Sequence, residues 1–303
     1  MQLLFLALLS VFLYTLYIRY FKRIKQYERE EGLASHKSKT GTITMGGIIF
    51  VVLPMFFLFY DSKTLNIAIT IFLYGLLGFA DDLLIILKHN NKGIHPSLKL
   101  LLQVLIAGVS FFLYLQSGMA TEVQLFGFRI DIKWIYGLLM LLILTSSTNA
   151  FNLTDGVDGL CSGLSLLLSL GFLYISYKKQ EFSIFYMILC IMIPLFIFWC
   201  FNYPKAFLFM GDTGSLFLGA FYAMLALYLD CILPFMLMGA LFIFETLSVI
   251  LQVGYFKKTK GKRLFKMAPF HHHLEACGIK EIYVDLIFYA IQIALIWITI
   301  LLL

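Results

Sequence analysis

Residues 182–200 read FSIFYMILCIMIPLFIFWC, a run of nineteen residues that contains no charged side chain. A helix needs about 20 mostly apolar residues to cross a bilayer, so this run predicts a transmembrane helix. The whole chain agrees, because 61% of its 303 residues are hydrophobic and only 13% are charged. A soluble domain is roughly 45–50% apolar and about 25% charged. The composition therefore excludes a soluble globular enzyme, a disordered chain and a disulfide scaffold.

Nine further apolar runs accompany this one, and their length indicates helices rather than a β-barrel. We therefore predict an all-α integral membrane protein, a single polytopic domain over residues 1–303 with ten transmembrane helices. The expected spans are 2–20, 45–60, 66–80, 98–115, 134–150, 160–177, 182–200, 213–229, 231–255 and 283–303. Residues 122–132, EVQLFGFRIDI, instead alternate in polarity about Gly127 and predict a small extracytoplasmic β-hairpin.

Lysine and arginine set the expected orientation. Positive charge follows the first apolar run instead of preceding it, which places the N-terminus outside. With that start, 18 of the 23 Lys and Arg residues fall in loops that face the cytoplasm. Such a bias is a strong positive-inside signal, so we expect both termini outside. We interpret the net charge of +6 as part of this signal, and expect the lipid bilayer, not a nucleic acid, as partner.

Most acidic residues that are not on loop surfaces fall in three short phrases, and a basic phrase and a histidine phrase join them. Ionisable groups near membrane depth are costly, so each phrase is a candidate functional segment. The predicted topology places all five on the cytoplasmic side, which indicates one site facing the cytoplasm. The phrases are SKTGTITMGG (38–47), GFADD (78–82), NAFNLTDGVDGL (149–160), FMGDTGSL (209–216) and MAPFHHHLE (267–275).

Three carboxylates in these phrases are candidate site residues. Asp81 and Asp82 are adjacent and are expected to end the third span, where their mutual repulsion and the negative end of the helix dipole both disfavour them. A bound cation or a proton would relieve this, although the pair could simply face water. Asp212 precedes an apolar run, so it is either the N-cap of that helix or a metal ligand beside a bound phosphate.

A second group of oxygen-bearing side chains recurs every three residues: Asn149, Asn152, Asp155 and Asp158. Because three helical residues advance about 300°, these side chains would form a slowly winding polar stripe. Hard oxygen donors on one stripe suit Mg²⁺, a ribose or the edge of a base. Capping of a helix end by Asn and Asp at a loop is the alternative.

Lys39 and Thr44 lie in a short loop with glycine at the start of the second span. A lysine with hydroxyls and free backbone N–H groups at a helix start is typical of a phosphate cradle. The alternative is a border lysine whose ammonium extends to water.

His271, His272 and His273 are consecutive, so they cannot share one metal ion as an i, i+4 pair would. We predict that they donate to a diphosphate or act as a general acid; an interfacial polar turn is the alternative. Glu245 and Gln252 lie two turns apart on one face of the ninth span. Glu245 is expected to face the bundle interior, either with a direct role or paired with a lysine.

Taken in this order, the phrases resemble the phospho-N-acetylmuramoyl-pentapeptide-transferase family, which belongs to the polyprenyl-phosphate N-acetylhexosamine-1-phosphate transferases. The likeness runs from about Ser35 to Gln292. It implies a ten-span homodimer of the bacterial cytoplasmic membrane that uses Mg²⁺. It also implies transfer of phospho-MurNAc-pentapeptide from UDP-MurNAc-pentapeptide to undecaprenyl phosphate, with release of UMP. The alternatives are a sibling that transfers N-acetylglucosamine-1-phosphate, which the HHH phrase disfavours, and a transporter with an acidic cytoplasmic cavity.

The resemblance also implies roles for individual residues. Asp212 matches a magnesium ligand, which we expect Asp155 to assist, and Asp81 matches a proposed base for the lipid phosphate. The catalytic residues are then Asp81, Asp82, Asp212 and His271, with a covalent route through Asp212 left open. Phe209 matches an aromatic residue that stacks on uracil. The expected substrate-binding residues are Lys39, Thr44, Asn149, Asn152, Asp155, Asp158, Asn202, Phe209, Gln252, His272 and His273.

Two positions depart from the family pattern. Ile43 replaces a proline that would fix the φ angle of its loop, and Ile85 replaces a lysine that follows the acidic pair. We therefore carry no phosphate-binding role to residue 85, and expect Lys88 or Lys99 to supply that charge. The lipid groove is marked by no motif; we place it, as a hypothesis, on the apolar faces of the run 231–255.

Overall fold

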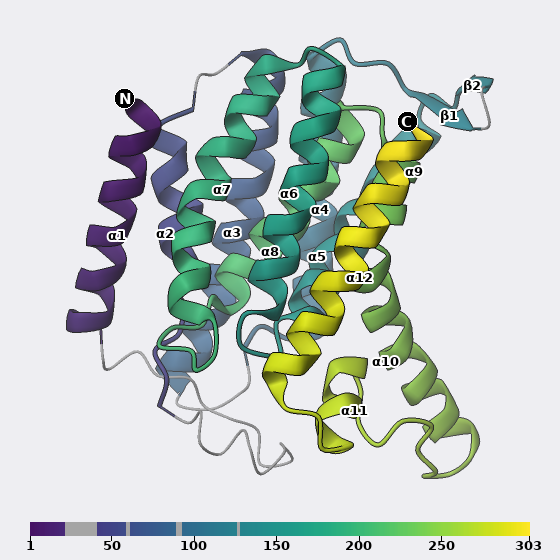
Figure 1. Ribbon diagram of the computed structural model, residues 1–303. Coiled ribbons are helices and arrows are strands. Elements are labelled where there is room, and N and C mark those ends of the chain that lie inside the picture. The colour runs from purple at the N-terminus through teal and green to yellow at the C-terminus, as the bar shows by residue number, and fades with distance from the viewer. Residues whose placement is uncertain (22–40, 59–60, 89–92, 126–127) are drawn as a thin grey trace.

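The computed structural model describes residues 1–21, 41–58, 61–88, 93–125 and 128–303, which form a bundle of helices (Figure 1). Both termini lie at the end of the bundle that carries the β-hairpin, whereas α10 and α11 lie toward the opposite end. The helices are α1 (Gln2–Tyr20), α2 (Gly47–Val52), the 3-10 helix η2 (Leu53–Phe56), α3 (Ser62–Lys88), α4 (Pro96–Gln116), α5 (Ile135–Thr154), α6 (Leu160–Lys178), α7 (Phe182–Asn202), α8 (Gly211–Tyr228), α9 (Ile232–Met238), α10 (Ala240–Lys258), α11 (Phe270–Ala276) and α12 (Glu281–Leu302).

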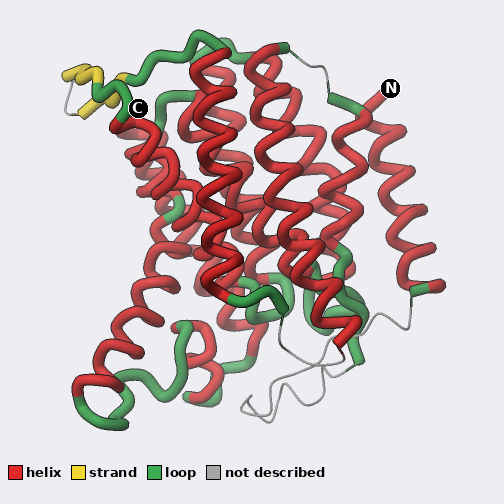
Figure 2. The backbone as a smooth tube through the Cα atoms, turned by 180° about the vertical axis from the view of Figure 1, so that it is seen from behind, coloured by secondary structure: helices red, strands yellow, loops and turns green. Residues whose placement is uncertain are grey.

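Eight helices of the described segments are long and apolar enough to cross a membrane, so the predicted all-α membrane fold is confirmed. They are α1, α3, α4, α5, α6, α7, α10 and α12. The expected number of ten spans and the side on which the termini lie stay predictions. Seen from behind, the same bundle consists of helices joined by loops, with strand only in the hairpin (Figure 2).

The hairpin is present as predicted. Strand β1 (Glu122–Leu125) pairs antiparallel with β2 (Phe128–Asp131), so that Glu122 faces Asp131 and Leu125 faces Phe128. Thr121 closes the open end, because its hydroxyl donates to the Asp131 carboxylate at 2.6 Å.

The ninth predicted run, 231–255, is two helices instead of one. Helix α9 ends and α10 begins at Gly239, after which α10 leans away from the bundle (Figure 1). A Cβ atom at Gly239 would lie 3.0 Å from the Phe235 carbonyl oxygen, so glycine suits this tight break. The second predicted run also ends early, in the 3-10 turn that contains Pro54, because proline cannot donate to a helix ladder.

Helix α8 is the centre of the bundle, with every side chain from Thr213 to Tyr228 buried. Two glycines let neighbouring helices approach its backbone. A Cβ atom on Gly78 of α3 would lie 2.6 Å from the Thr213 nitrogen, and one on Gly219 of α8 would lie 2.8 Å from the Ser147 carbonyl oxygen of α5. The Gly78 contact places the first turn of α8 directly against α3, near the acidic pair.

We expect Gly78→Ala to lower the thermal unfolding midpoint in detergent, because its methyl group would overlap the Asp212 backbone. Overpacking of this kind costs about 1–3 kcal/mol. Gly108→Ala is the matched control: Gly108 also lies inside a helix, α4, but a Cβ atom there meets nothing within 4 Å. Alanine at that position should be neutral or stabilising, since it favours helix by roughly 0.5–1 kcal/mol. Equal midpoints for the two variants would contradict the close approach of α3 and α8.

Candidate functional site

The acidic pair lies inside α3, not at its end. Asp81 and Asp82 are buried, with 6% and 7% of their surfaces exposed, and the helix continues to Lys88. The prediction that they end a span is therefore wrong. The apolar residues after Asp82 continue the helix, and partners on α4 and α8 compensate the two carboxylates.

Lys99, in the first turn of α4, bridges two carboxylates. Its ammonium lies 3.2 Å from Asp81 Oδ2 and also contacts Asp212 Oδ2. Asp81 Oδ1 in addition accepts the Ile94 N–H at 2.6 Å. Of the two lysines that the sequence offered for this charge, Lys99 is in the site, whereas Lys88 is exposed at the end of α3.

Asp212 lies in the first turn of α8, one position after Gly211, the first helical residue. The N-cap is Met210, so the N-cap interpretation of Asp212 is wrong. Its Oδ1 accepts a hydrogen bond from Asn152 Nδ2 at 2.7 Å, and the same amide lies 3.0 Å from Ser215 Oγ. The carboxylate thus joins α8 to α5, and the positive end of the α8 dipole favours its charge.

Asp82 caps α8 from the neighbouring helix. Its Oδ1 accepts the Asp212 N–H at 3.0 Å, and its Oδ2 accepts the Thr213 N–H at 2.9 Å and the Thr213 hydroxyl at 2.6 Å. The first N–H groups of a helix have no partner within it, and the Met210 side chain cannot supply one. Asp82 therefore holds the backbone of Asp212, while Asp81 and Asp212 share the Lys99 ammonium.

The predicted polar stripe is helical only in its first half. Helix α5 ends at Thr154, and Asp155 is its C-cap. The prediction of a continuous helical stripe that reaches Asp158 is therefore wrong. The chain turns here because Gly159 adopts φ +85°, a left-handed conformation that favours glycine. Asn149 remains on the helix, where its Nδ2 lies 3.2 Å from Gln103 Oε1.

Asp158 and Asn202 hold the loops around this turn. Asp158 Oδ2 accepts the Ala206 N–H at 2.9 Å. Asn202 Oδ1 accepts the Gly159 N–H at 3.0 Å, and its Nδ2 donates to the Leu208 carbonyl at 2.9 Å. With 2% of its surface exposed, Asn202 connects the 155–160 turn to the segment that leads into Phe209.

Thr44 and Phe209 lie in two segments that pair with each other. The Phe209 N–H donates to the Ile43 carbonyl, and the Gly46 N–H donates to the Phe209 carbonyl, both at 2.8 Å. The sequence-predicted loop is thereby fixed against the start of α8. Lys39 lies outside the described residues.

The three histidines occupy the short helix α11. His271 is fully buried, and its Nδ1 lies 3.3 Å from Glu245 Oε2. His272 Nδ1 pairs with Glu275 at 2.6 Å, and His273 Nδ1 accepts the Lys266 N–H at 3.1 Å.

Gly156 connects these histidines to the polar turn after α5. A Cβ atom there would lie 3.0 Å from His272 Nε2 and would also overlap His271 Nε2. The Nε2 edges of both rings therefore face the turn that holds Asp155 and Asp158.

The side-chain amide of Gln252 forms hydrogen bonds with the backbone of the loop before α11. Its Oε1 accepts the N–H groups of Leu264 and Phe265 at 3.0 and 2.8 Å, and its Nε2 donates to the Phe265 carbonyl at 3.1 Å. It holds the loop before α11, a structural role that its place in an apolar run does not indicate.

The donor set of the carboxylate cluster fits a magnesium ion. Within the described ranges, no group of three or more His, Cys, Asp and Glu side chains is arranged to hold a metal. Asp81 and Asp212, however, already face one common cation, the Lys99 ammonium. Carboxylate oxygens are the hard donors that Mg²⁺ prefers.

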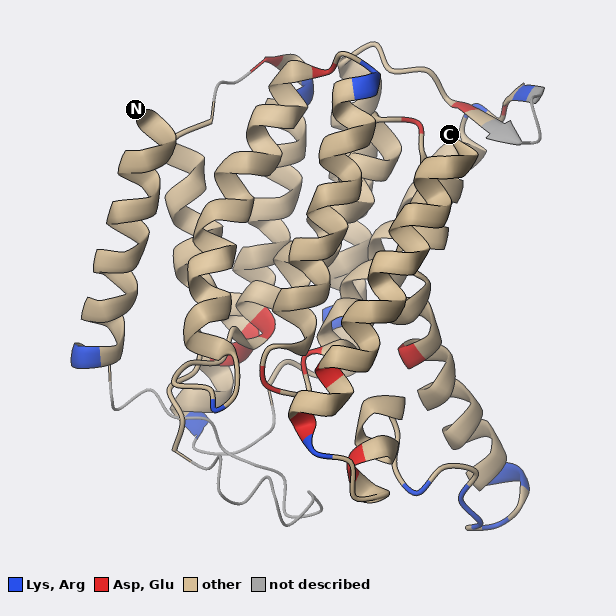
Figure 3. Ribbon diagram, in the orientation of Figure 1, with Lys and Arg blue, Asp and Glu red and all other residues tan. Residues whose placement is uncertain are grey.

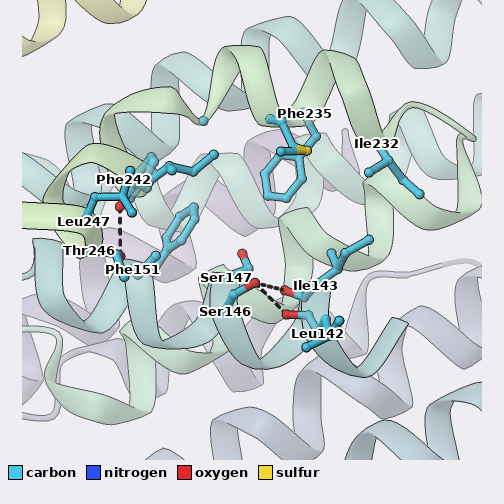
Figure 4. A pocket seen from close by; sticks show the side chains of 14 residues that line it. Leu142, Ile143, Ser146, Ser147, Phe151, Ile232, Phe235, Phe242, Thr246 and Leu247 are labelled. Atoms are coloured by element: carbon cyan, nitrogen blue, oxygen red, sulfur yellow. Dashed lines mark hydrogen bonds between the residues drawn. The ribbon is translucent and has the colours of Figure 1, made fainter. Parts of the chain in front are cut away.

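An apolar cavity of about 300 Å³ lies between α5, α9 and α10 (Figure 4). Its walls include Phe151 and Phe242, whose rings stack at 3.9 Å, and one side belongs to the run where the sequence hypothesis placed a lipid groove. Phe151 directly precedes Asn152, so helix α5 both lines the cavity and, through Asn152, contacts the Asp212 carboxylate.

Sequence reasoning missed Thr213, Ser215 and Gly156 as parts of the site. The first two could be expected from sequence, because Ser and Thr hydroxyls near a helix start commonly hydrogen-bond to groups close by. The role of Gly156 depends on α11, which lies more than a hundred residues away.

Comparison with known proteins gives a consistent result. Residues 64–230 match the family described as "Glycosyl transferase family 4". The phospho-N-acetylmuramoyl-pentapeptide-transferase of Streptococcus gordonii is 39% identical, over 86% of this chain and 83% of its own. The enzymes of the same name from Enterococcus faecalis and Geobacillus thermodenitrificans are each 37% identical, over 93% and 94% of this chain and 91% of their own lengths.

We expect Asp82→Asn to destabilise the start of α8. An amide offers one acceptor oxygen where Asp82 uses two, and a buried donor left without a partner costs about 1–3 kcal/mol. Asp61→Asn is the matched control, because Asp61 accepts the Thr64 N–H at 2.8 Å at the exposed start of α3, where Asn caps as well as Asp. Thermal unfolding in detergent checks this; a control that loses as much stability would count against the interhelical cap.

Proposed function

The chain belongs to glycosyl transferase family 4 and, within it, to the phospho-N-acetylmuramoyl-pentapeptide-transferases, and from this premise we propose the reaction that it carries out. It transfers phospho-MurNAc-pentapeptide from UDP-MurNAc-pentapeptide to undecaprenyl phosphate, forming the lipid-linked intermediate of peptidoglycan synthesis and UMP. We further propose that it works as a homodimer in the bacterial cytoplasmic membrane, with its active site on the cytoplasmic face.

One observation carries the proposal. Asp81, Lys99, Asn152 and Asp212 come from four different helices and meet through direct contacts. The chain direction places all four at the end of the bundle opposite the hairpin, where acidic and basic segments reach the bundle interior (Figure 3). A fixed cluster of charges is what phosphoryl transfer needs, because positioning and charge neutralisation supply most of the catalysis.

Each residue of the cluster has a separate role in the proposed transfer. Lys99 offsets negative charge on the phosphates, and Asn152 orients the Asp212 carboxylate. Asp81 accepts the proton of the lipid phosphate, and an oxygen of that phosphate then attacks the sugar-linked phosphorus of the UDP donor. The bond between this phosphorus and the bridging oxygen of the diphosphate breaks, and UMP leaves with that oxygen. Asp212 and Asp155 would hold Mg²⁺, which when bound neutralises phosphate oxygens. Asp82 keeps the backbone of Asp212 in place.

Several of the other predicted residues lie around the turn after α5, where we propose that the nucleotide binds. Asp158 and Asn202 tie together the two loops that bring Phe209 beside the turn after α5. We propose that Phe209 stacks on the uracil base, that Asp155 assists the metal, and that His271 and His272 donate to the diphosphate.

The apolar cavity between α5 and α10 supports a lipid acceptor. Its lining is almost entirely hydrocarbon and aromatic, which suits a polyprenyl chain, and α5 leads from it to Asn152. We propose that the first isoprene units lie there with the phosphate directed toward Lys99.

Purified protein should release UMP from UDP-MurNAc-pentapeptide only when undecaprenyl phosphate is present. UDP-N-acetylglucosamine, offered in a parallel assay, should give no product. The opposite preference would favour the N-acetylglucosamine-1-phosphate transferase alternative. Absence of UMP with either donor, together with their movement across vesicle membranes, would favour the transporter.

We expect Asp212→Asn to lower the rate of UMP release by about 10²–10³-fold, the usual cost of losing one electrostatic stabiliser. Removal of Mg²⁺ with a chelator should abolish release by the unsubstituted protein. Asp230→Asn, an exposed position beyond the other end of α8, should leave the rate unchanged. A folded Asp212→Asn enzyme that keeps more than a few per cent of activity with Mg²⁺ would refute the metal-ligand role.

A further inference from the structure

Glu245 caps the histidine helix from inside a membrane span. It lies in α10 with none of its surface exposed. Its Oε2 accepts the Phe270 N–H at 2.7 Å and its Oε1 accepts the His271 N–H at 3.1 Å. The residue that precedes α11 is Pro269, whose side chain cannot cap a helix, so Glu245 supplies the acceptors that α11 lacks.

The same carboxylate also lies beside the His271 ring. Glu245 Oε2 is 3.3 Å from His271 Nδ1, and both side chains are fully buried. Within the described part of the chain, neither ring nitrogen of His271 has a hydrogen-bond partner in this arrangement. The ring is therefore placed with Nδ1 toward α10 and Nε2 toward Gly156 and the polar turn.

A buried carboxylate must be compensated, and here the compensation comes from α11. In the described segments, the ion pairs of Glu245 include no lysine or arginine, so the predicted lysine pairing is absent there. Two backbone N–H groups and the positive end of a helix dipole replace it. Both carboxylate oxygens are thus occupied by α11.

Gln252, two turns further along α10, holds the loop that enters α11. The stretch from Leu264 to His271 is consequently fixed to one face of α10 at two points. A histidine on a seven-residue helix gains its precise place from these contacts, because so short a helix is not stable alone.

We infer that Glu245 is a positioning residue, which sets the place and ring orientation of His271 for the reaction proposed above, on which this inference rests. It touches no substrate. Its effect is to keep His271 Nε2 against the turn of Asp155 and Asp158. A misplacement of about 1 Å at such a group can cost about 100-fold in rate.

The test compares the full-length enzyme with Glu245→Gln, His271→Ala and the double variant, by kcat and KM for UMP release. We expect Glu245→Gln to lower kcat by about 100-fold with little change in KM. His271→Ala should then add little in the Glu245→Gln background, because residues that act as a unit are not additive. Effects that multiply, or an unchanged kcat in Glu245→Gln, would overturn the inference.

Two further variants separate positioning from loss of stability. Gln292→Leu is the matched control: Gln292 is also fully buried in a span, but its Nε2 donates to Met238, away from α11. It should keep kcat even where it lowers the unfolding temperature. Gly156→Ala should lower kcat with Glu245 intact, since its methyl group would displace the His271 ring while its own φ is unstrained. Wild-type kcat in Gly156→Ala would contradict the ring placement.

Hydrogen exchange tests the same contact without turnover. The amides of Phe270 and His271 should exchange faster in Glu245→Gln than in the wild type or in Gln292→Leu. Unchanged exchange would overturn the inference. An inactive wild-type enzyme would instead refute the proposed function, and the exchange result would then decide the role of Glu245 as a cap.

Discussion

The Lys99 ammonium between Asp81 and Asp212 is the interaction on which the arrangement of this site depends. Two carboxylates this close, in a bundle with few other charges, repel each other strongly where water is scarce. One cation between them removes that repulsion and joins α3, α4 and α8 at a single point. Loss of Lys99 would leave both carboxylates without their shared cation, and removing the partner of a buried charge typically costs about 3–5 kcal/mol.

Two other carboxylates accept hydrogen bonds from backbone N–H groups instead of pairing with a lysine or arginine. Asp82 caps the start of α8, which carries Asp212, and Glu245 caps the start of α11, which carries His271. In both cases an acid on one helix satisfies the free N–H groups of another. Because a buried helix start cannot use water for this purpose, each cap also fixes the position of the first turn, which carries Asp212 in α8 and His271 in α11.

Much of the fold and the membership of the site could be predicted from sequence, because both depend on local pattern. Apolar runs located the spans, and Asp81, Asp212 and Asn152 were identified from their phrases. The continuation of α3 beyond Asp82 could not be predicted, since it depends on partners from α4 and α8. The break at Gly239 and the bonds of Gln252 depend likewise on how distant segments pack. Lys99 was recognised only as one of two lysines, because sequence does not show which one reaches the acids.

The reactivity of Lys99 tests the central claim most directly. Purified protein would be acetylated briefly with a limiting reagent, and the extent at each lysine measured by mass spectrometry. We expect Lys99 to react far more slowly than exposed Lys88, and to react faster once Asp81 and Asp212 are both changed to asparagine. A Lys99 that reacts as fast as Lys88, or whose rate ignores both substitutions, would contradict the account.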